Sequence, residues 1–239
     1  MNLLLLQPAE LRDGGQAEIQ LSRYPPRAGL WPPSPGRKLR VGLRDGHIGS
    51  AIVTAIDGNT ARLALEELRD EPPAALPLQL LLALPRPKML RRVLRCAAEI
   101  GIKRIWLLNT TRVEKSYWQS PLLSPANVDT WCAAGLEQAV DTRMPTVCLR
   151  QRFKPFVEDE LRGIAAGTTC LVAHPSAATV ARPAPAPITL AVGPEGGFTE
   201  YEIGMLREAG FTSCSLGPRV LRVETALPVL AATLLPCDG

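Results

Sequence analysis

Alternating apolar and polar positions dominate the first 70 residues of the chain, and the residues between these stretches favour tight turns. Three such stretches are separated by an Asp-Gly pair and by an Asp-Gly-Asn triplet: residues 39–43, 48–56 and 60–65. Turn residues of this kind between apolar segments predict two successive β-hairpins. Because no part of this region has a helical period, we expect it to form a small β-barrel or β-sandwich.

A different pattern begins after residues 70–75, a polar stretch with two prolines that is typical of a linker. Beyond it, short apolar runs alternate with segments of helical period. The expected strands are residues 78–84, 102–108, 145–149, 169–173, 188–192 and 214–216, and the expected helices are residues 88–101, 127–139, 199–210 and 224–235. This alternation predicts an α/β fold with a mostly parallel sheet covered on both faces. We therefore expect two domains, residues 1–72 and 75–239.

Composition narrows the class of protein without identifying it. The 239 residues are 46% hydrophobic and 21% charged, which is typical of a soluble globular protein with a substantial core. The net charge of +4 is compatible with a polyanionic partner, but many unrelated enzymes share it. The apolar run at residues 3–6 is too short for a signal peptide or a membrane span, so we expect a cytoplasmic protein that does not bind a membrane.

Cysteine and histidine are too sparse and scattered to predict a metal site. None of the six cysteines belongs to a Cys-x-x-Cys pair, and the histidines are His47 and His174. No zinc-ligand spacing can be assembled from them, so we expect no metal. His174 follows the strand expected at residues 169–173, where a hydrogen-bonded structural role is favoured over a role as a base.

Two glycine-rich turns near the carboxyl end carry the clearest functional signal. Residues 193–197 (Gly-Pro-Glu-Gly-Gly) follow the strand expected at 188–192, and residues 216–226 (Leu-Gly-Pro-Arg-Val-Leu-Arg-Val-Glu-Thr-Ala) follow the next one. Glycine lets backbone N–H and C=O groups approach a ligand without a Cβ in the way. In open α/β sheets ligands bind at the carboxyl ends of strands, so we expect both turns to line one site.

Each turn also has a plain structural interpretation. The first would only reverse the chain, and the second would be a basic helix entry with weak surface ion pairs. Neither turn matches GxxxxGK or GxGxxG, which argues against a ligand held mainly through phosphates. The two turns instead favour a ligand that is held by backbone groups and needs no metal. Arg219, Arg222 and Glu224 add charge there, and Arg222 and Glu224 either pair with each other or face a substrate.

The segments GPEGGFTEYEI and LGPRVLRVETAL resemble the two C-terminal signature loops of the ribosomal RNA small subunit methyltransferase E family, which belongs to the SPOUT superfamily. The resemblance covers about residues 75–235. It implies a sheet with a deep trefoil knot, a PUA-like RNA-binding β-barrel before it, and a homodimer with the cofactor at its interface. The implied reaction is transfer of a methyl group from S-adenosylmethionine to N3 of a uridine in 16S rRNA of the small ribosomal subunit.

The same resemblance implies which residues form the site. Arg222 and Arg219 would stabilise charge that develops on the uracil ring, and Glu224 or Glu195 would take the proton from N3. The residues implied around the cofactor are Leu171, His174, Val192, Gly193, Pro194, Glu195, Gly196, Gly197, Leu216, Gly217, Val220, Leu221, Thr225 and Ala226.

Four cations are the candidates for contact with RNA: Lys88, Arg91, Arg112 and Arg143. Lys88 and Arg91 begin a basic stretch that is either a phosphate-contacting face or an ordinary solvated helix face. For Arg143 the alternative is an ion pair with Glu137 at a helix end. Proline-rich residues 24–36 replace a helix that the family carries, which leaves an inactive RNA-binding relative open as an alternative. A methyltransferase for another RNA also stays open, because the cofactor loops say less about the substrate than the N-terminal domain does.

Overall fold

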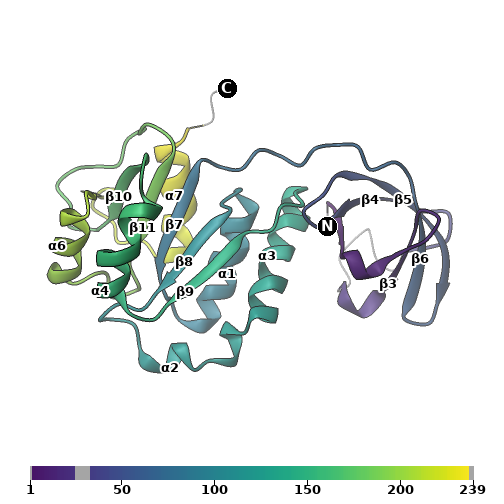
Figure 1. Cartoon of the computed structure of the whole chain (residues 1–239), viewed down its shortest axis with the longest axis horizontal. Helices are drawn as coiled ribbons and strands as arrows, with labels where there is room; N and C mark the ends of the chain where they lie inside the picture. Colours follow the sequence, from purple (N-terminus) through teal and green to yellow (C-terminus); the bar gives the residue numbers. More distant parts are fainter. Residues whose placement is uncertain (1, 25–32, 237–239) are drawn as a thin grey trace. The chain divides into compact units, whose positions relative to one another are not determined.

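The computed structural model describes residues 2–24 and 33–236 of the chain. The chain divides into two compact units, Met1–Ala74 with Ala133–Met144 and Ala75–Cys132 with Pro145–Gly239. They are called the N-terminal unit and the C-terminal unit below (Figure 1). Most of the proline-rich segment at 24–36, which is expected to replace a family helix, lies outside the described residues.

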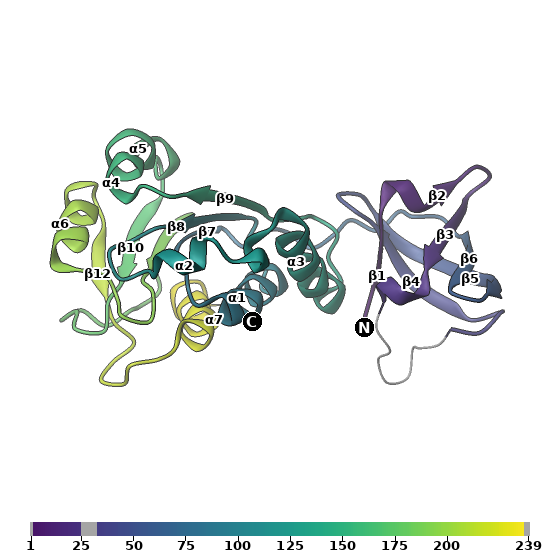
Figure 2. The same ribbon diagram turned by 90° about the horizontal axis from the view of Figure 1, so that it is seen from below.

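The N-terminal unit is built on a six-stranded sheet that curls on itself, with the strand order β1-β4-β5-β6-β3-β2 (Figure 2). Its strands are β1 (Leu4–Leu6), β2 (Leu11–Arg12), β3 (Gln16–Gln20), β4 (Lys38–Leu43), β5 (Ile48–Asp57) and β6 (Thr60–Leu65), with short 3-10 helices at Pro8–Glu10 and Leu21–Arg23. The antiparallel pairs β4–β5 and β5–β6 confirm both predicted hairpins. β1 pairs in parallel with β4.

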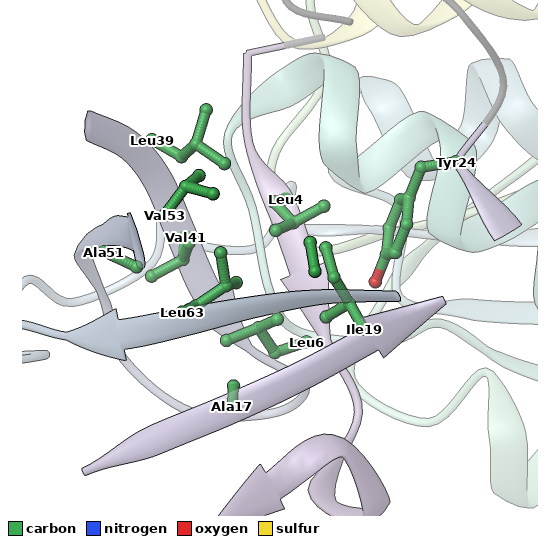
Figure 3. Packing of buried hydrophobic residues seen from close by; sticks show 11 residues of the cluster. Leu4, Leu6, Ala17, Ile19, Tyr24, Leu39, Val41, Ala51, Val53 and Leu63 are labelled. Atoms are coloured by element: carbon green, nitrogen blue, oxygen red, sulfur yellow. The ribbon is translucent and has the colours of Figure 1, made fainter. Parts of the chain in front are cut away.

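Alternation along these strands gathers one set of apolar side chains into a shared core (Figure 3). Val41 on β4 and Val53 on β5 are fully buried in it. Burying a side chain of this size contributes about 1.5–3 kcal/mol. Tyr24 packs into the same cluster and donates its hydroxyl to the Leu5 carbonyl at 3.1 Å. Burial raises the pKa of Tyr24, so the phenol stays neutral and keeps donating this hydrogen bond.

The C-terminal unit contains a second six-stranded sheet, in which every pair is parallel and the order is β12-β10-β11-β7-β8-β9. Its strands are β7 (Leu78–Ala83), β8 (Arg104–Leu108), β9 (Thr146–Arg150), β10 (Thr169–Ala173), β11 (Ile188–Val192) and β12 (Thr212–Cys214). Every residue of the central strands β7 and β11 is buried, which explains their nearly unbroken apolar sequences. The predicted α/β class with a parallel sheet is confirmed.

Helices cover both faces of this sheet, with α1 and α7 on one face and α4 and α5 on the other (Figure 2). The helices are α1 (Pro87–Glu99), α2 (Lys115–Trp118), α3 (Pro125–Ala139), α4 (Phe153–Pro155), α5 (Leu161–Ile164), α6 (Glu200–Glu208) and α7 (Val223–Leu234), with a 3-10 turn at Pro121–Leu123 and a π-helical stretch at Phe156–Glu160. α1 and α7 pack against each other. The buried residues of α1 are the apolar stripe expected from its sequence: Leu90, Val93, Leu94, Ala97 and Ala98.

Glycines and a capping box set the ends of the predicted helices. Gly101 after α1 and Gly210 after α6 have φ values of +88° and +95°, the left-handed conformation that glycine adopts without strain. At the start of α6, Thr199 Oγ1 accepts the N–H of Glu202, and the Glu202 carboxylate accepts the N–H of Thr199 at 2.8 Å. The strand expected at 214–216 ends instead at Cys214, because the chain leaves the sheet there to enter the following turn.

Candidate functional site

Three neighbouring strands of the parallel sheet end at the same edge, and each is followed by a turn. β10 ends at Ala173, β11 at Val192 and β12 at Cys214, and Ala173 is the register partner of both of the others. Parallel strands bring their carboxyl ends together, so the connections that follow them converge. The structure therefore places the two glycine-rich turns next to each other.

A pocket opens between these connections, entirely within the C-terminal unit. Strand ends, both glycine-rich turns and the start of α7 form its walls. The lining residues are Ala173, His174, Pro175, Val192, Gly193, Pro194, Glu195, Gly197, Cys214, Ser215, Leu216, Arg219, Val220, Leu221, Arg222, Val223, Ala226 and Leu230. The walls are thus mainly apolar side chains and backbone, and their charged groups are Glu195, Arg219 and Arg222.

The pocket brings together most of the residues that the sequence singled out. Those that line it are His174, Val192, Gly193, Pro194, Glu195, Gly197, Leu216, Arg219, Val220, Leu221, Arg222 and Ala226. Five others lie in the same strands and turns but not in the lining: Leu171, Gly196, Gly217, Glu224 and Thr225. Sequence reasoning missed Ala173, Pro175, Cys214, Ser215, Val223 and Leu230, which flank strand ends or belong to the apolar face of α7.

The first turn is closed so tightly that Gly193 has no room for a side chain. A Cβ at this position would lie 3.0 Å from the Phe198 nitrogen and 3.2 Å from Gly197 backbone atoms. Gly197 has a φ of +71° and donates its N–H to the Pro194 carbonyl at 2.8 Å. The turn therefore presents backbone groups to the pocket, and it favours glycine at 193 for lack of space and at 197 for the left-handed conformation.

The second turn carries the two arginines to the start of α7. Gly217, with a φ of +93°, redirects the chain, and Arg222 is the residue before the helix, where its carbonyl accepts the Ala226 N–H. The side chains of Arg219 and Arg222 are exposed. Within the described part of the chain neither forms an ion pair, so the alternative of an Arg222–Glu224 pair is not what the structure shows. Both guanidinium groups are accessible to a substrate.

Contacts from other strand ends hold the first turn in place. Glu195 Oε1 accepts the Arg86 N–H at 3.1 Å, which ties the turn to the residue before α1. Arg112, after β8, donates from Nη1 to the Gly196 carbonyl and, at 3.5 Å, to the Phe198 carbonyl. The prediction assigned Arg112 to RNA, but in the structure its guanidinium group contacts the glycine-rich turn.

Cys214 lines the pocket at the end of β12 with an uncharged side chain. Burial raises the pKa of its thiol above the ordinary value for cysteine. The neutral form therefore persists to higher pH than in an exposed cysteine, and the pocket wall at this point stays apolar.

The remaining RNA candidates do not form one group. Lys88 and Arg91 lie on the exposed side of α1, near the further cations Arg92 and Arg95. Arg143 belongs to the N-terminal unit, where its Nη2 lies 3.2 Å from Glu71 Oε2. The structure thus distributes the predicted RNA contacts over both units.

Residues 2–24 and 33–236 contain neither a membrane-spanning helix nor a cluster of metal ligands. No helix in that part of the chain is long and apolar enough to cross a membrane. Nor does it contain a group of three or more His, Cys, Asp or Glu side chains arranged to hold a metal ion.

Known proteins resemble this chain both in sequence and in fold. The model of a family described as an RNA methyltransferase domain matches residues 72–235. A ribosomal RNA small subunit methyltransferase E from Treponema pallidum is 29% identical over 98% of this chain and 91% of its own length. A protein of the same name from Synechocystis is 30% identical over 79% of this chain and 62% of its own length. A ribosomal RNA small subunit methyltransferase E from Neisseria gonorrhoeae, solved with bound S-adenosyl methionine, has a TM-score of 0.72 at 23% identity and covers 97% of this chain and 96% of its own. That likeness shows a shared fold.

Proposed function

The chain belongs to the family of RNA methyltransferase domains, and from this premise we propose that it transfers the methyl group of S-adenosylmethionine to N3 of a uridine in 16S rRNA. The observation that carries the proposal is the pocket at the ends of β10, β11 and β12, with Arg219 and Arg222 in its wall. The names of the Treponema and Synechocystis relatives support the rRNA substrate. The ligand of the Neisseria structure supports the cofactor.

The residues of the pocket fit S-adenosylmethionine. Apolar side chains such as Val192, Leu221 and Leu230 suit the faces of an adenine ring, and the tightly turned backbone at Gly193 offers hydrogen-bonding groups at close range. The remaining proposed cofactor residues, Leu171, Gly196, Gly217 and Thr225, would act by shaping these walls. When bound, the cofactor supplies an electrophilic methyl group on a sulfonium, and most of the catalysis comes from holding donor and acceptor in line.

For methylation at uracil N3, the protein must accept the proton that N3 loses and stabilise the negative charge that remains on the ring. Uracil N3 carries a hydrogen that has to leave before or during attack, and the resulting charge spreads onto O2 and O4. Arg222 and Arg219 line the pocket, are exposed and are unpaired within the described residues, so we assign to them the hydrogen bonds to those oxygens. The proposed proton acceptor is Glu224, in the first turn of α7, or Glu195, whose Oε1 also accepts the Arg86 N–H.

The RNA would be held mainly through its phosphates. Lys88 and Arg91 begin an exposed row of cations on α1, and Arg143 adds a cation in the N-terminal unit. We assign RNA binding to the N-terminal unit as a PUA-like module and methyl transfer to the C-terminal unit as a knotted SPOUT domain. We further propose that the protein is a cytoplasmic homodimer and that it acts on the small ribosomal subunit.

Labelled transfer tests this function. Purified protein is incubated with S-adenosylmethionine tritiated in the methyl group and with small ribosomal subunits or naked 16S rRNA that lack the modification. The proposal predicts label in 16S rRNA and none in 23S rRNA or transfer RNA. Label confined to one of those other RNAs would favour a methyltransferase for a different substrate. Cofactor binding without any transfer would favour an inactive RNA-binding relative.

A further inference from the structure

The glycine-rich turn at residues 193–197 is braced from outside by the segment that follows β8. Arg112 lies 84 positions before Gly196 in the sequence, yet its Nη1 donates to the Gly196 carbonyl. The same nitrogen lies 3.5 Å from the Phe198 carbonyl. These two carbonyls flank Gly197, the residue in the left-handed conformation. One guanidinium nitrogen therefore contacts the backbone on both sides of Gly197, where the chain reverses.

The stem of Arg112 also packs on the turn. A Cβ at Gly196 would lie 3.2 Å from Arg112 Cδ, closer than ordinary van der Waals contact, and 3.4 Å from Arg112 Cβ. The side chain thus fills the space directly beside Gly196. The side chain of Arg112 therefore packs beside Gly196 and donates hydrogen bonds to the Gly196 and Phe198 carbonyls.

A buried carboxylate fixes the position from which Arg112 reaches the turn. Glu202 on α6 is only 2% exposed, and its Oε1 accepts the N–H of Thr111 at 2.7 Å. Its Oε2 accepts the N–H of Thr199 at 2.8 Å and the Thr199 hydroxyl at 3.0 Å. Glu202 therefore links the residue before Arg112 to Thr199, which caps α6 two positions after the turn.

From this geometry we propose that Arg112 is a positioning residue that orders the cofactor-binding turn before the cofactor arrives. The inference rests on the proposed function, since it assumes that the turn binds S-adenosylmethionine. Glycine loses more conformational freedom on ordering than any other residue, and this turn contains three glycines. A brace that holds the turn in its bound conformation lowers the entropic cost of binding.

Hydrogen exchange of the ligand-free protein tests the brace without reference to function. The variants are Arg112→Ala, Arg112→Lys and, as a control with the same loss of charge, Arg207→Ala at the exposed end of α6. The proposal predicts that Arg112→Ala raises exchange about tenfold in peptides covering residues 193–199. Arg112→Lys should show a smaller rise, and Arg207→Ala none. Unchanged exchange in Arg112→Ala would overturn the proposal.

Calorimetry then asks whether the brace matters for the cofactor. Arg112→Ala should weaken S-adenosylmethionine binding about tenfold and raise its KM, with kcat largely recovered at saturating cofactor. If cofactor affinity is unchanged while RNA affinity falls, Arg112 is an RNA ligand and the proposal is wrong. If the wild-type protein binds no S-adenosylmethionine, the proposed function fails, whereas the exchange result still decides whether Arg112 orders the turn.

Discussion

The main-chain carbonyl of Arg222 accepts the N–H of Ala226 at 2.7 Å, so α7 begins directly after Arg222. The backbone of Arg222 is thereby fixed by the helix, and its side chain is left exposed in the pocket wall. The helix thus fixes the main chain from which this side chain extends, and the side chain makes no capping hydrogen bond. Mutation can therefore remove the side chain while the main-chain carbonyl that starts the helix remains.

Replacement of Arg222 by alanine tests its role on the acceptor side. We expect Arg222→Ala to lower kcat by about 10²–10³-fold, the effect of losing one donor to a developing negative charge. The melting temperature and the affinity for S-adenosylmethionine should stay near the wild-type values, because the helix-starting carbonyl remains. Full turnover in this variant would remove Arg222 from the mechanism.

Gly193 offers a test of the turn geometry with an internal control. In Gly193→Ala the new Cβ would meet backbone atoms of Gly197 and Phe198, so the turn has to open and cofactor binding should fall by more than tenfold. Gly204→Ala, inside α6 where a Cβ has open space, should instead stabilise the protein by about 0.4–1 kcal/mol. Calorimetry and urea denaturation measure the two effects. Equal cofactor affinity in both variants would contradict the close approach at Gly193.

Glu202 is predicted to be essential for stability as a carboxylate. In Glu202→Gln, whichever way the amide is oriented, its NH₂ group faces the N–H of either Thr111 or Thr199. A buried donor without an acceptor costs about 1–3 kcal/mol. The matched control is Glu208→Gln, at an exposed position of the same helix, which should change the free energy of unfolding by less than about 0.5 kcal/mol. Indistinguishable urea midpoints for the two variants would show that Glu202 does not hold this region together.

The salt dependence of RNA binding tests the basic face of α1. Removing two phosphate contacts in Lys88→Ala/Arg91→Ala should lower the slope of log affinity against log salt by about 1.4 for single-stranded RNA. S-adenosylmethionine affinity should not change, since neither residue lines the pocket. The double variant Arg162→Ala/Arg207→Ala removes the same charge elsewhere in the C-terminal unit. An equal change of slope in both double variants would mean that α1 is only a solvated face.

Local patterns predicted those parts of the fold that local interactions determine. The apolar runs of β7 and β11, the hairpins of the N-terminal unit and the capping box of α6 all depend on neighbours in sequence. β1 was not predicted, because Leu4–Leu6 becomes a strand only by pairing with β4, more than 30 residues later. The sequence also gave no sign of the short helical turns at residues 153–164.

The same limit applies to the site. Glycine turns after two apolar runs predicted that residues 193–197 and 216–226 converge, and the resemblance to a methyltransferase family that they suggested is confirmed by the family model. Ala173 and Cys214 line the pocket because of where their strands end, so their side-chain chemistry gave no signal. The contact of Arg112 with Gly196 joins segments that are 84 positions apart, and no local sequence pattern predicts such a long-range contact.

Identification of the methylated nucleoside distinguishes methylation of uridine N3 from every other methyl transfer to rRNA. Small ribosomal subunits that lack the modification are incubated with the protein and S-adenosylmethionine, and their 16S rRNA is digested to nucleosides and analysed by mass spectrometry. The proposed function predicts 3-methyluridine, at close to one per 16S rRNA, with the wild-type protein, and a rate lowered by about 10²–10³-fold with Arg222→Ala. A different methylated nucleoside, or no methylated product from an enzyme that binds the cofactor, would contradict it.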